Sequence, residues 1–414
     1  MKNSVKLNFN KLIWFFLALF IIFPWHSTAN SLLKWITISG NITILSVFAI
    51  LILMILMLYT INDGFVIKKT NVPVLIYCLL LFMAFCRGDA PITTRVLDCG
   101  NIIFQMAIYW GIQNRRTQKK TIQEFLTLTV KLMNVNYCIN VVFFLTRSFS
   151  LWGITSSDQA RFGGGFFALG IVTGSVALYS LCTEEKILSK KDSYITLALV
   201  LFGFIVSAVR TNLIVFLEIA CIIIFIDRYR SMQKSTAVTK MLIVFGGLIA
   251  VAFLLRGNSY IAERLLSTNS LQTDGNVKIR ISTLEYYLGF VKNHPLGAGF
   301  GYMVHFVHWN GSTLENQLSI DNSFLYCAIK CGIPTTIMFF YIVVIKPIIN
   351  VVKSSNTKNF KICMISIWIG YIFATGIMTN QIFYSITNSA FIWAMLSTLS
   401  SNREVDEERM IYNE

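Results

Sequence analysis

The sequence predicts an all-α protein that crosses a membrane many times. Hydrophobic residues make up 55% of the 414 residues and charged residues 13%, about half the charged share of an ordinary soluble domain. The mean hydropathy is +0.64. Apolar runs long enough for a bilayer-spanning helix, which needs about 20 residues, recur along the chain. These observations exclude a soluble globular fold.

Twelve apolar runs are predicted as membrane-spanning helices. They cover residues 12–28, 40–61, 72–86, 96–113, 121–146, 164–183, 192–208, 211–227, 241–255, 322–345, 362–379 and 381–400. Lysines and arginines concentrate in every second interval between the runs, which is the pattern of cytoplasmic segments. We therefore expect a single transmembrane domain, 1–414, with both termini and a short tail at 401–414 in the cytoplasm.

The net charge of +15 follows largely from this topology. Cations on the cytoplasmic side face anionic lipid, so the charge does not call for a nucleic-acid partner. The first run, 12–28, follows three lysines and also resembles a secretory signal peptide. A first membrane helix with a basic inner flank explains it equally well, because many more apolar runs follow.

A long polar interval, 256–321, separates the ninth and tenth predicted helices and is expected to form a large external loop. Within it, Ile281, Leu284 and Leu288 recur at helical spacing, and a proline follows shortly after. We predict an amphipathic helix over about 278–292 that lies on the outer surface of the bilayer.

No cofactor or metal is expected at this loop. The glycine run 297–301 follows a helix and a proline, rather than lying between a strand and a helix as a nucleotide-binding loop does. The chain contains no Walker A sequence and no D-x-D motif. His294, His305 and His308 lack the spacing of a metal-ligand cluster.

Arginine is the prevailing cation of the predicted outer segments. These arginines are Arg87, Arg95, Arg147, Arg161 and Arg210 in the short segments, and Arg264 and Arg280 in the long loop. Guanidinium groups bind phosphate and carboxylate bidentately, whereas topology requires only a positive charge. Ordinary interfacial arginine is the alternative interpretation, and it suits Arg87, Arg95 and Arg147 best.

Arg210 marks a predicted break between two apolar runs. Without a turn there, residues 192–227 would form one run too long for a single span of about 20 residues. An ionisable residue at such a break is a functional candidate.

The loop ends at Asp321-Asn322, where the tenth predicted helix begins. Asp321 is the acid best placed to accept a proton from an attacking hydroxyl group. A helix N-cap, which aspartate favours, is the alternative role. Lys330 would lie half a turn from Asp321 on a regular helix, so we predict that it contacts another helix instead.

The order of these motifs resembles a known family. The motifs are Ser207 to Arg210 between two helices, a large outer loop with Arg280, Asn293 to Gly301, Asp321 to Leu325, and Gly332-Ile333. Together they resemble the O-antigen polymerase and O-antigen ligase superfamily of bacterial envelope glycosyltransferases, most clearly over residues 160 to 345. The resemblance implies a GT-C-like protein of the inner membrane. Ligases commonly carry histidine where this chain has Asp321, which favours the polymerase branch.

The resemblance also implies the chemistry. The enzyme would polymerise oligosaccharide repeat units carried on polyprenyl pyrophosphate, for O-antigen or capsular polysaccharide, at the outer face of the membrane and without metal. The predicted catalytic residues are Asp321, Arg210 and Arg280, and the predicted substrate-binding residues are Arg161, Arg264, His294 and Asn322. Besides the lipid-linked glycan and the bilayer, a chain-length regulator protein is an expected partner.

Two other functions compete with polymerisation. A ligase would transfer finished glycan to lipid A core by the same chemistry. A flippase would move the lipid-linked oligosaccharide across the membrane, but transporters often show internal repeats, and the two halves of this sequence show no clear similarity.

Overall fold

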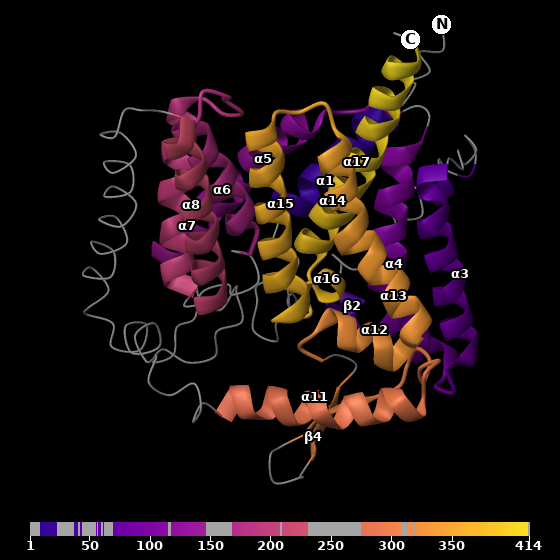
Figure 1. Ribbon diagram of the computed structural model, residues 1–414. Helices are drawn as coiled ribbons and strands as arrows, with labels where there is room; N and C mark the ends of the chain where they lie inside the picture. The colour runs from indigo at the N-terminus through magenta and orange to yellow at the C-terminus, as the bar shows by residue number, and fades with distance from the viewer. Residues whose placement is uncertain are drawn as a thin grey trace, which may run out of the picture.

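The protein forms a helical bundle with one helix lying across its end, α11 (Gly275–Asn293), so the all-α class is confirmed (Figure 1). The computed structural model describes residues 9–22, 37–39, 42–43, 55, 57–58, 61, 69–114, 117–145, 168–207, 209–230, 275–307, 313–317 and 320–412. The last helix, α17 (Ile386–Tyr412), ends at the opposite end of the bundle from α11 (Figure 1).

The remaining elements follow in chain order. In the first half they are α1 (Phe9–Ile22), β1 (Thr37–Ser39), β2 (Ile42–Thr43), η2 (Lys69–Asn71), α3 (Val72–Arg87), α4 (Ile92–Gln113), α5 (Ile122–Leu145), α6 (Leu169–Cys182), α7 (Lys190–Ser207) and α8 (Arg210–Arg230). In the second half they are β3 (Val304–Val307), β4 (Thr313–Gln317), α12 (Ser323–Cys331), α13 (Ile333–Phe340), η8 (Tyr341–Ile345), α14 (Lys346–Lys353), α15 (Lys358–Ile372), η9 (Phe373–Ile377) and α16 (Gln381–Tyr384).

Four helices of the described residues are long and apolar enough to cross a membrane. They are Lys69–Arg87, Ile122–Val142, Ile333–Lys353 and Lys358–Ile377. The protein is therefore a membrane protein, while the count of twelve spans stays a prediction. The predicted span 241–255 lies outside the described residues, as does most of 40–61.

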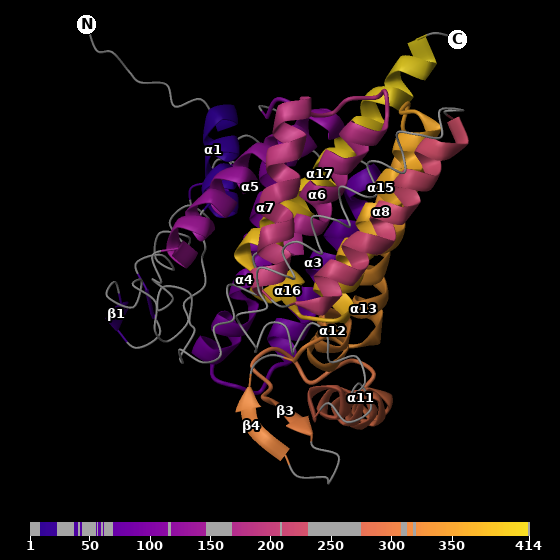
Figure 2. The same ribbon diagram turned by 90° about the vertical axis from the view of Figure 1, so that its left-hand side faces the viewer.

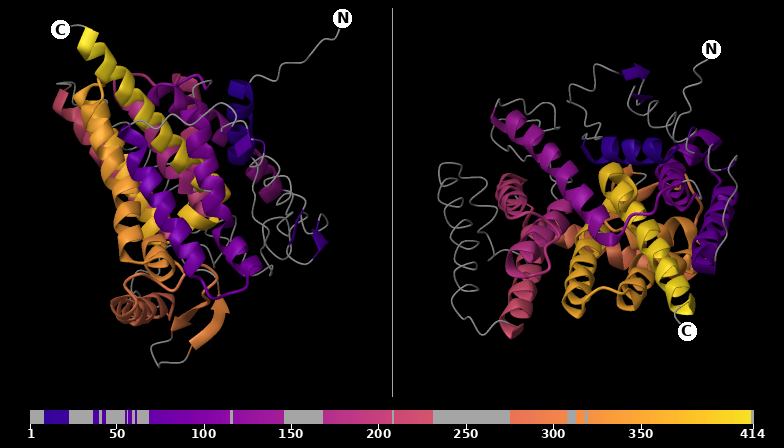
Figure 3. Two further views of the ribbon diagram at one scale, coloured as in Figure 1. Left: turned by 90° about the vertical axis from the view of Figure 1, so that its right-hand side faces the viewer. Right: turned by 90° about the horizontal axis from the view of Figure 1, so that it is seen from above.

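The helices divide into two groups with a shared centre. α6, α7 and α8 lie on one side, α3 and α4 lie on the other, and α15 and α17 lie between them (Figures 1 and 3). Gly174 lets α6 approach its neighbours, because a Cβ atom there would lie 2.9 Å from the ring of Phe216 and 3.0 Å from Val200. Small residues at helix contacts are typical of membrane bundles, where close packing replaces the hydrophobic effect as the force between helices.

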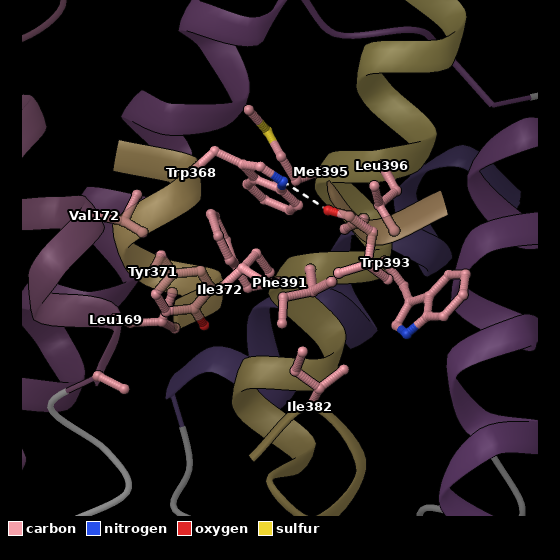
Figure 4. Packing of buried hydrophobic residues seen from close by; sticks show 14 of the residues in the cluster. Leu169, Val172, Trp368, Tyr371, Ile372, Ile382, Phe391, Trp393, Met395 and Leu396 are labelled. Carbon is pink, nitrogen blue, oxygen red and sulfur yellow. Dashed lines mark hydrogen bonds between the residues drawn. The ribbon is translucent and has the colours of Figure 1, made fainter. Parts of the chain in front are cut away.

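Aromatic side chains fill the centre of the bundle (Figure 4). The indole Nε1 of Trp368 on α15 donates a hydrogen bond of 2.8 Å to the carbonyl of Val343 in the π-helical segment η8. Tyr371 meets Phe391 of α17 edge to face, with ring centroids 5.4 Å apart. Leu169 of α6 points toward the same cluster (Figure 4). This packing joins α6, α15 and α17 into one scaffold.

The predicted break near Arg210 is confirmed, since α7 ends at Ser207 and α8 begins at Arg210. The prediction of one helix over 322–345 is wrong. Gly332 has φ +89 and separates α12 from α13. A Cβ atom at Gly332 would lie 2.3 Å from the carbonyl carbon of Leu296, so the break makes room for the loop that follows α11.

The span predicted at 381–400 is likewise interrupted. It consists of the short helix α16, a break at Ser385, and α17, which continues to Tyr412. The tail predicted from residue 401 is therefore helical as far as Tyr412.

The end of the bundle next to α11 also contains a hairpin that the sequence did not predict. Strands β3 and β4 pair antiparallel, with His305 opposite Asn316. Figure 2 shows the hairpin beside α11, which it contacts through β3. Strands β1 and β2 form a second, smaller hairpin.

Candidate active site

Arg280 and Asp321, two residues predicted to be catalytic, lie together at the end of the bundle that α11 crosses. Arg280 is in the second turn of α11, and Asp321 stands just before α12. The Nη2 atom of Arg280 lies 3.0 Å from Oδ2 of Asp321, and the two side chains are 44% and 47% exposed. An ion pair this exposed contributes only about 0–1 kcal/mol to stability, so a bound anion can displace the carboxylate at little cost.

The helix cap is Asn322 and not Asp321, so the N-cap alternative for Asp321 is wrong. The Oδ1 atom of Asn322 accepts a hydrogen bond of 2.8 Å from the amide of Leu325, as an N-cap side chain does. Its Nδ2 atom donates to the carbonyl of Ile377, 3.1 Å away. Asn322 therefore fixes the start of α12 against η9, and the carboxylate of Asp321 is left to pair with Arg280.

A second polar contact secures the same junction. The hydroxyl of Ser323 donates to Oδ1 of Asn380, 2.8 Å away, and both residues are buried. The start of α12 is thus held at two points against the chain between η9 and α16. Asp321 projects from a firmly anchored base.

Arg210 begins α8 at the same end of the bundle. α8 packs against α15, because a Cβ atom at Gly370 would lie 2.7 Å from Val215 and 2.9 Å from Ile219. α8 also contacts η9, the segment to which Asn322 is bonded. α8 and the start of α12 therefore share η9 as a neighbour. Arg210 is half-buried.

His294 lies at the other end of α11 from Arg280. Asn293 follows Arg280 by thirteen positions along the helix, a rise of about 20 Å. His294 is exposed, and its ring packs against Phe290 with ring centroids 4.6 Å apart and an interplanar angle of 31°. His294 is therefore remote from the ion pair. Arg161 and Arg264 lie outside the described residues.

The face of α11 that packs against the protein carries Thr283 and Tyr287, which are buried. Thr283 Oγ1 accepts a hydrogen bond of 3.0 Å from the amide of Val307, and the phenol oxygen of Tyr287 accepts one of 2.7 Å from the amide of His305. Burial raises the pKa of Tyr287 to about 12. Both bonds join α11 to β3.

The predicted apolar stripe of α11 points away from this contact. Ile281, Leu284 and Leu288 are 51%, 41% and 57% exposed. Only Val291, at the end of the stripe, is buried. The described residues thus leave about half of each of these three side chains exposed.

The glycine run docks the loop between two parts of the bundle. Gly299 has φ +88, and a Cβ atom there would lie 2.4 Å from the Cα atom of Gly88. Arg87 donates to the carbonyls of Leu296 and Gly297. Arg87, predicted as an ordinary interfacial arginine, therefore contributes to loop docking.

Lys330 contacts another helix, as predicted. Its Nζ atom lies 2.6 Å from Oδ2 of Asp98 on α4, and both side chains are fully buried. Sequence reasoning overlooked Asp98, although it is the only charged residue in the predicted span 96–113. A single acid within an apolar run was the available signal, because such residues are costly unless they are paired.

No group of three histidine, cysteine or acidic residues in the described part of the chain is arranged to hold a metal ion. The site that the structure assembles is instead an arginine and a carboxylate beside a helix cap.

Residues 195–340 match the family model described as O-antigen ligase. The matched segment runs from α7 to the end of α13 and holds Arg210, Arg280 and Asp321. The superfamily resemblance is thereby confirmed for this segment, and such a family implies, broadly, a membrane enzyme of the glycosyl-transfer type. A comparison with curated proteins gives no match.

Proposed function

We propose that the protein polymerises oligosaccharide repeat units carried on polyprenyl pyrophosphate, for O-antigen or capsular polysaccharide, at the outer face of the bacterial inner membrane. The contact between Arg280 and Asp321 carries this proposal, because it joins an anion-binding group to a proton acceptor. The pair lies within the segment that matches the family model. In this orientation both termini are cytoplasmic.

The transfer step requires a leaving group to be stabilised. The bond between the sugar C1 and the diphosphate oxygen breaks, and the lipid diphosphate leaves with the electron pair. Guanidinium groups aimed at this developing charge lower the barrier, as preorganised donors do. We assign this role to Arg280 and Arg210, whose planar forks suit phosphate oxygens.

Asp321 is the proposed base. The hydroxyl of the acceptor sugar attacks C1, forms the new glycosidic bond and gives its proton to the carboxylate of Asp321. In the structure this carboxylate is paired with Arg280. When the donor diphosphate takes over the guanidinium, the carboxylate is released to accept the proton. Binding of the donor would thus prepare the base.

The other predicted residues have supporting roles in this proposal. The side chain of Asn322 is engaged in the helix cap and in the bond to η9, so it acts by holding Asp321 in place. His294, about 20 Å along α11 from Arg280, suits a sugar remote from the bond that forms. Arg161 and Arg264 are proposed to bind the glycan or its diphosphate.

The exposed stripe of α11 is proposed to rest on the outer leaflet of the bilayer. Its three exposed apolar residues lie on a helix that crosses the end of the bundle (Figure 1), where the headgroups and acyl chains of the outer leaflet meet. This placement would bring Arg280 to the depth of a lipid-linked diphosphate. A chain-length regulator is a further proposed partner.

A ligase is the second candidate, because the matching family model is described as O-antigen ligase. A gene deletion separates the two activities. Loss of a polymerase leaves surface glycan of a single repeat unit, whereas loss of a ligase leaves polymer on its lipid carrier. We expect the first pattern, and we expect Arg280→Ala to reproduce it with the protein still present in the membrane. Polymer accumulating on the carrier would establish the ligase instead.

A further inference from the structure

Asp98 is the centre of a buried polar cluster that joins three parts of the chain. Its Oδ2 atom accepts hydrogen bonds from Lys330 Nζ at 2.6 Å and from the amide of Gly301 at 2.7 Å. Its Oδ1 atom accepts one of 2.7 Å from the hydroxyl of Tyr326. Lys330 also donates to the carbonyl of Tyr302. Asp98 belongs to α4, Tyr326 and Lys330 to α12, and Gly301 and Tyr302 to the outer loop.

This cluster is satisfied only when the loop is docked. The side chains of Asp98 and Lys330 are both 0% exposed. A buried ion needs further hydrogen bonds in addition to its partner, since each desolvated charge costs several kcal/mol. Two of these bonds come from the backbone of Gly301 and Tyr302. Withdrawal of the loop would leave both charges under-bonded, so loop docking and the packing of α12 on α4 form together.

The loop is also bonded along the end of α12. The amides of Ala298 and Gly299 donate to the carbonyls of Ile329 and Lys330, each at 2.8 Å. The amide of Ile333, at the start of α13, donates to the carbonyl of Pro295 at 2.8 Å. The backbone of the glycine run is therefore hydrogen-bonded to the junction of α12 and α13.

The two elements held by this cluster carry the two halves of the candidate site. α12 begins two residues after Asp321. The loop continues directly from α11, which carries Arg280. No bond of the cluster touches Arg280 or Asp321, yet the cluster sets where α11 lies relative to α12. Catalytic groups a single ångström out of place lose about 100-fold in rate.

We propose that Asp98 and Lys330 are positioning residues that hold Arg280 and Asp321 in register through the docked loop. The expected effect of this pair on glycan transfer rests on the proposed function. Its expected effect on the placement of α11 relative to α12 does not. The geometric consequence is that neutralising one member of the buried pair loosens α11 relative to α12. Replacing both charges with neutral hydrogen-bonding groups should restore the register.

The test uses the full chain, purified in lipid nanodiscs, with spin labels at Glu285→Cys on α11 and Asp321→Cys. The exposed cysteines Cys86 and Cys138 are replaced beforehand. We expect a narrow distance distribution in the parent protein, a broadened one in Lys330→Met, and a narrow one again in Asp98→Asn/Lys330→Gln. An unchanged distribution in Lys330→Met overturns the proposal.

Lys346→Met is the matched control. Lys346 is also a buried lysine, and its Nζ donates to the carbonyl of Thr70 and the hydroxyl of Tyr109, away from the loop. This variant also removes a buried ammonium group that donates to neighbouring oxygens, and it should keep the narrow distribution. A broadening equal to that of Lys330→Met would show a general loss of packing and would also overturn the proposal.

Activity is measured in the same variants without labels. We expect kcat/KM for glycan transfer to fall about 100-fold in Lys330→Met and to recover in the neutral double variant. If neither the parent nor any variant transfers glycan, the proposed function is wrong. The spin-label distances still test whether Asp98 and Lys330 position α11 relative to α12. If Lys330→Met does not accumulate, Tyr326→Phe is used instead, because it removes the hydroxyl that donates to Asp98 and removes no charge. A partial broadening in it supports the proposal, and an unchanged distribution contradicts it.

Discussion

Arg280 and Asp321 are 41 residues apart in the sequence and meet through one hydrogen bond of 3.0 Å between Nη2 and Oδ2. A single, half-exposed contact holds the carboxylate weakly and leaves the rest of the guanidinium fork for an anion. The ion pair therefore adds little to stability, and each charged group stays paired with the other until a ligand replaces it.

Replacing Arg280 should impair catalysis strongly while leaving the fold intact, because its ion pair is exposed. We expect Arg280→Ala to lower kcat about 100-fold to 1000-fold, which is the usual cost of removing one donor to a developing charge. Arg280→Lys should recover only part of this loss, since an ammonium lacks the planar fork. Transfer of a radiolabelled lipid-linked glycan by purified protein measures both.

Lys292→Ala is the control, because Lys292 is an exposed cation at the far end of the same helix. It should leave the rate within about twofold of the parent, as expected for a surface charge remote from the reaction. Equal losses in Arg280→Ala and Lys292→Ala would point to general electrostatics instead of a specific site.

Asp321 and Asn322 should separate activity from stability. Asn322→Ala removes the cap of α12 and should lower the free energy of unfolding by about 1 kcal/mol, visible as a lower Tm. Asp321→Asn should keep the Tm and abolish transfer. Asn322→Ser, which can cap, should regain most of the lost stability. A large fall in Tm in Asp321→Asn, with no fall in Asn322→Ala, would reverse our assignment of the cap.

The surface of α11 should report its contact with lipid. Leu284 and Glu285 are neighbours in sequence but lie on different faces of the helix, and Leu284 is part of the exposed apolar stripe. In nanodiscs, a spin label at Leu284→Cys should be more accessible to oxygen, which concentrates in lipid. A label at Glu285→Cys should be more accessible to a water-soluble nickel complex. The same accessibility at both positions would remove α11 from the membrane surface.

The joint between α11 and β3 should weaken at alkaline pH. The pKa of Tyr287 is raised to about 12 by burial, so below pH 10 the phenol is neutral in both folded and unfolded chains. Above the ordinary pKa of about 10 the unfolded chain loses this proton first, and stability falls as pH rises toward 12. Tyr287→Phe lacks this dependence.

The measurement is the Tm of the parent and of Tyr287→Phe between pH 9 and pH 12. At pH 9 the parent should be the more stable, because its phenol oxygen accepts the amide of His305. The difference should shrink as pH rises through the window. A constant difference would show that Tyr287 does not titrate there.

Much of the helical bundle could be predicted from the sequence, because a helix that crosses a bilayer needs an apolar run of a certain length. The break at Arg210 was predictable on that ground alone. The break at Gly332 was not evident from hydropathy, because glycine and isoleucine both fit an apolar run. The close approach of Leu296 is what requires the turn. Pro334, in the first turn of α13, was the local sign of a new helix.

Residues of the candidate site could be predicted from the sequence, but their arrangement in space could not. Asp321 and Asn322 are both good caps, and only the backbone of the folded chain selects Asn322. The helical period of α11 was evident from the sequence. Which face of the helix packs was not, because the partner strand β3 had no clear sequence signal. The packed face is the one with Thr283 and Tyr287. Asp98 was missed because its partners lie more than 200 residues away.

The close approach of Gly88 and Gly299 has a consequence for how such chains diversify. The two backbones touch where no side chain fits, so the loop that follows α11 is not a module that can be exchanged alone. A chimera that imports the loop from a relative must bring the end of α3 and the start of α4 with it. These distant segments would therefore be exchanged as one block.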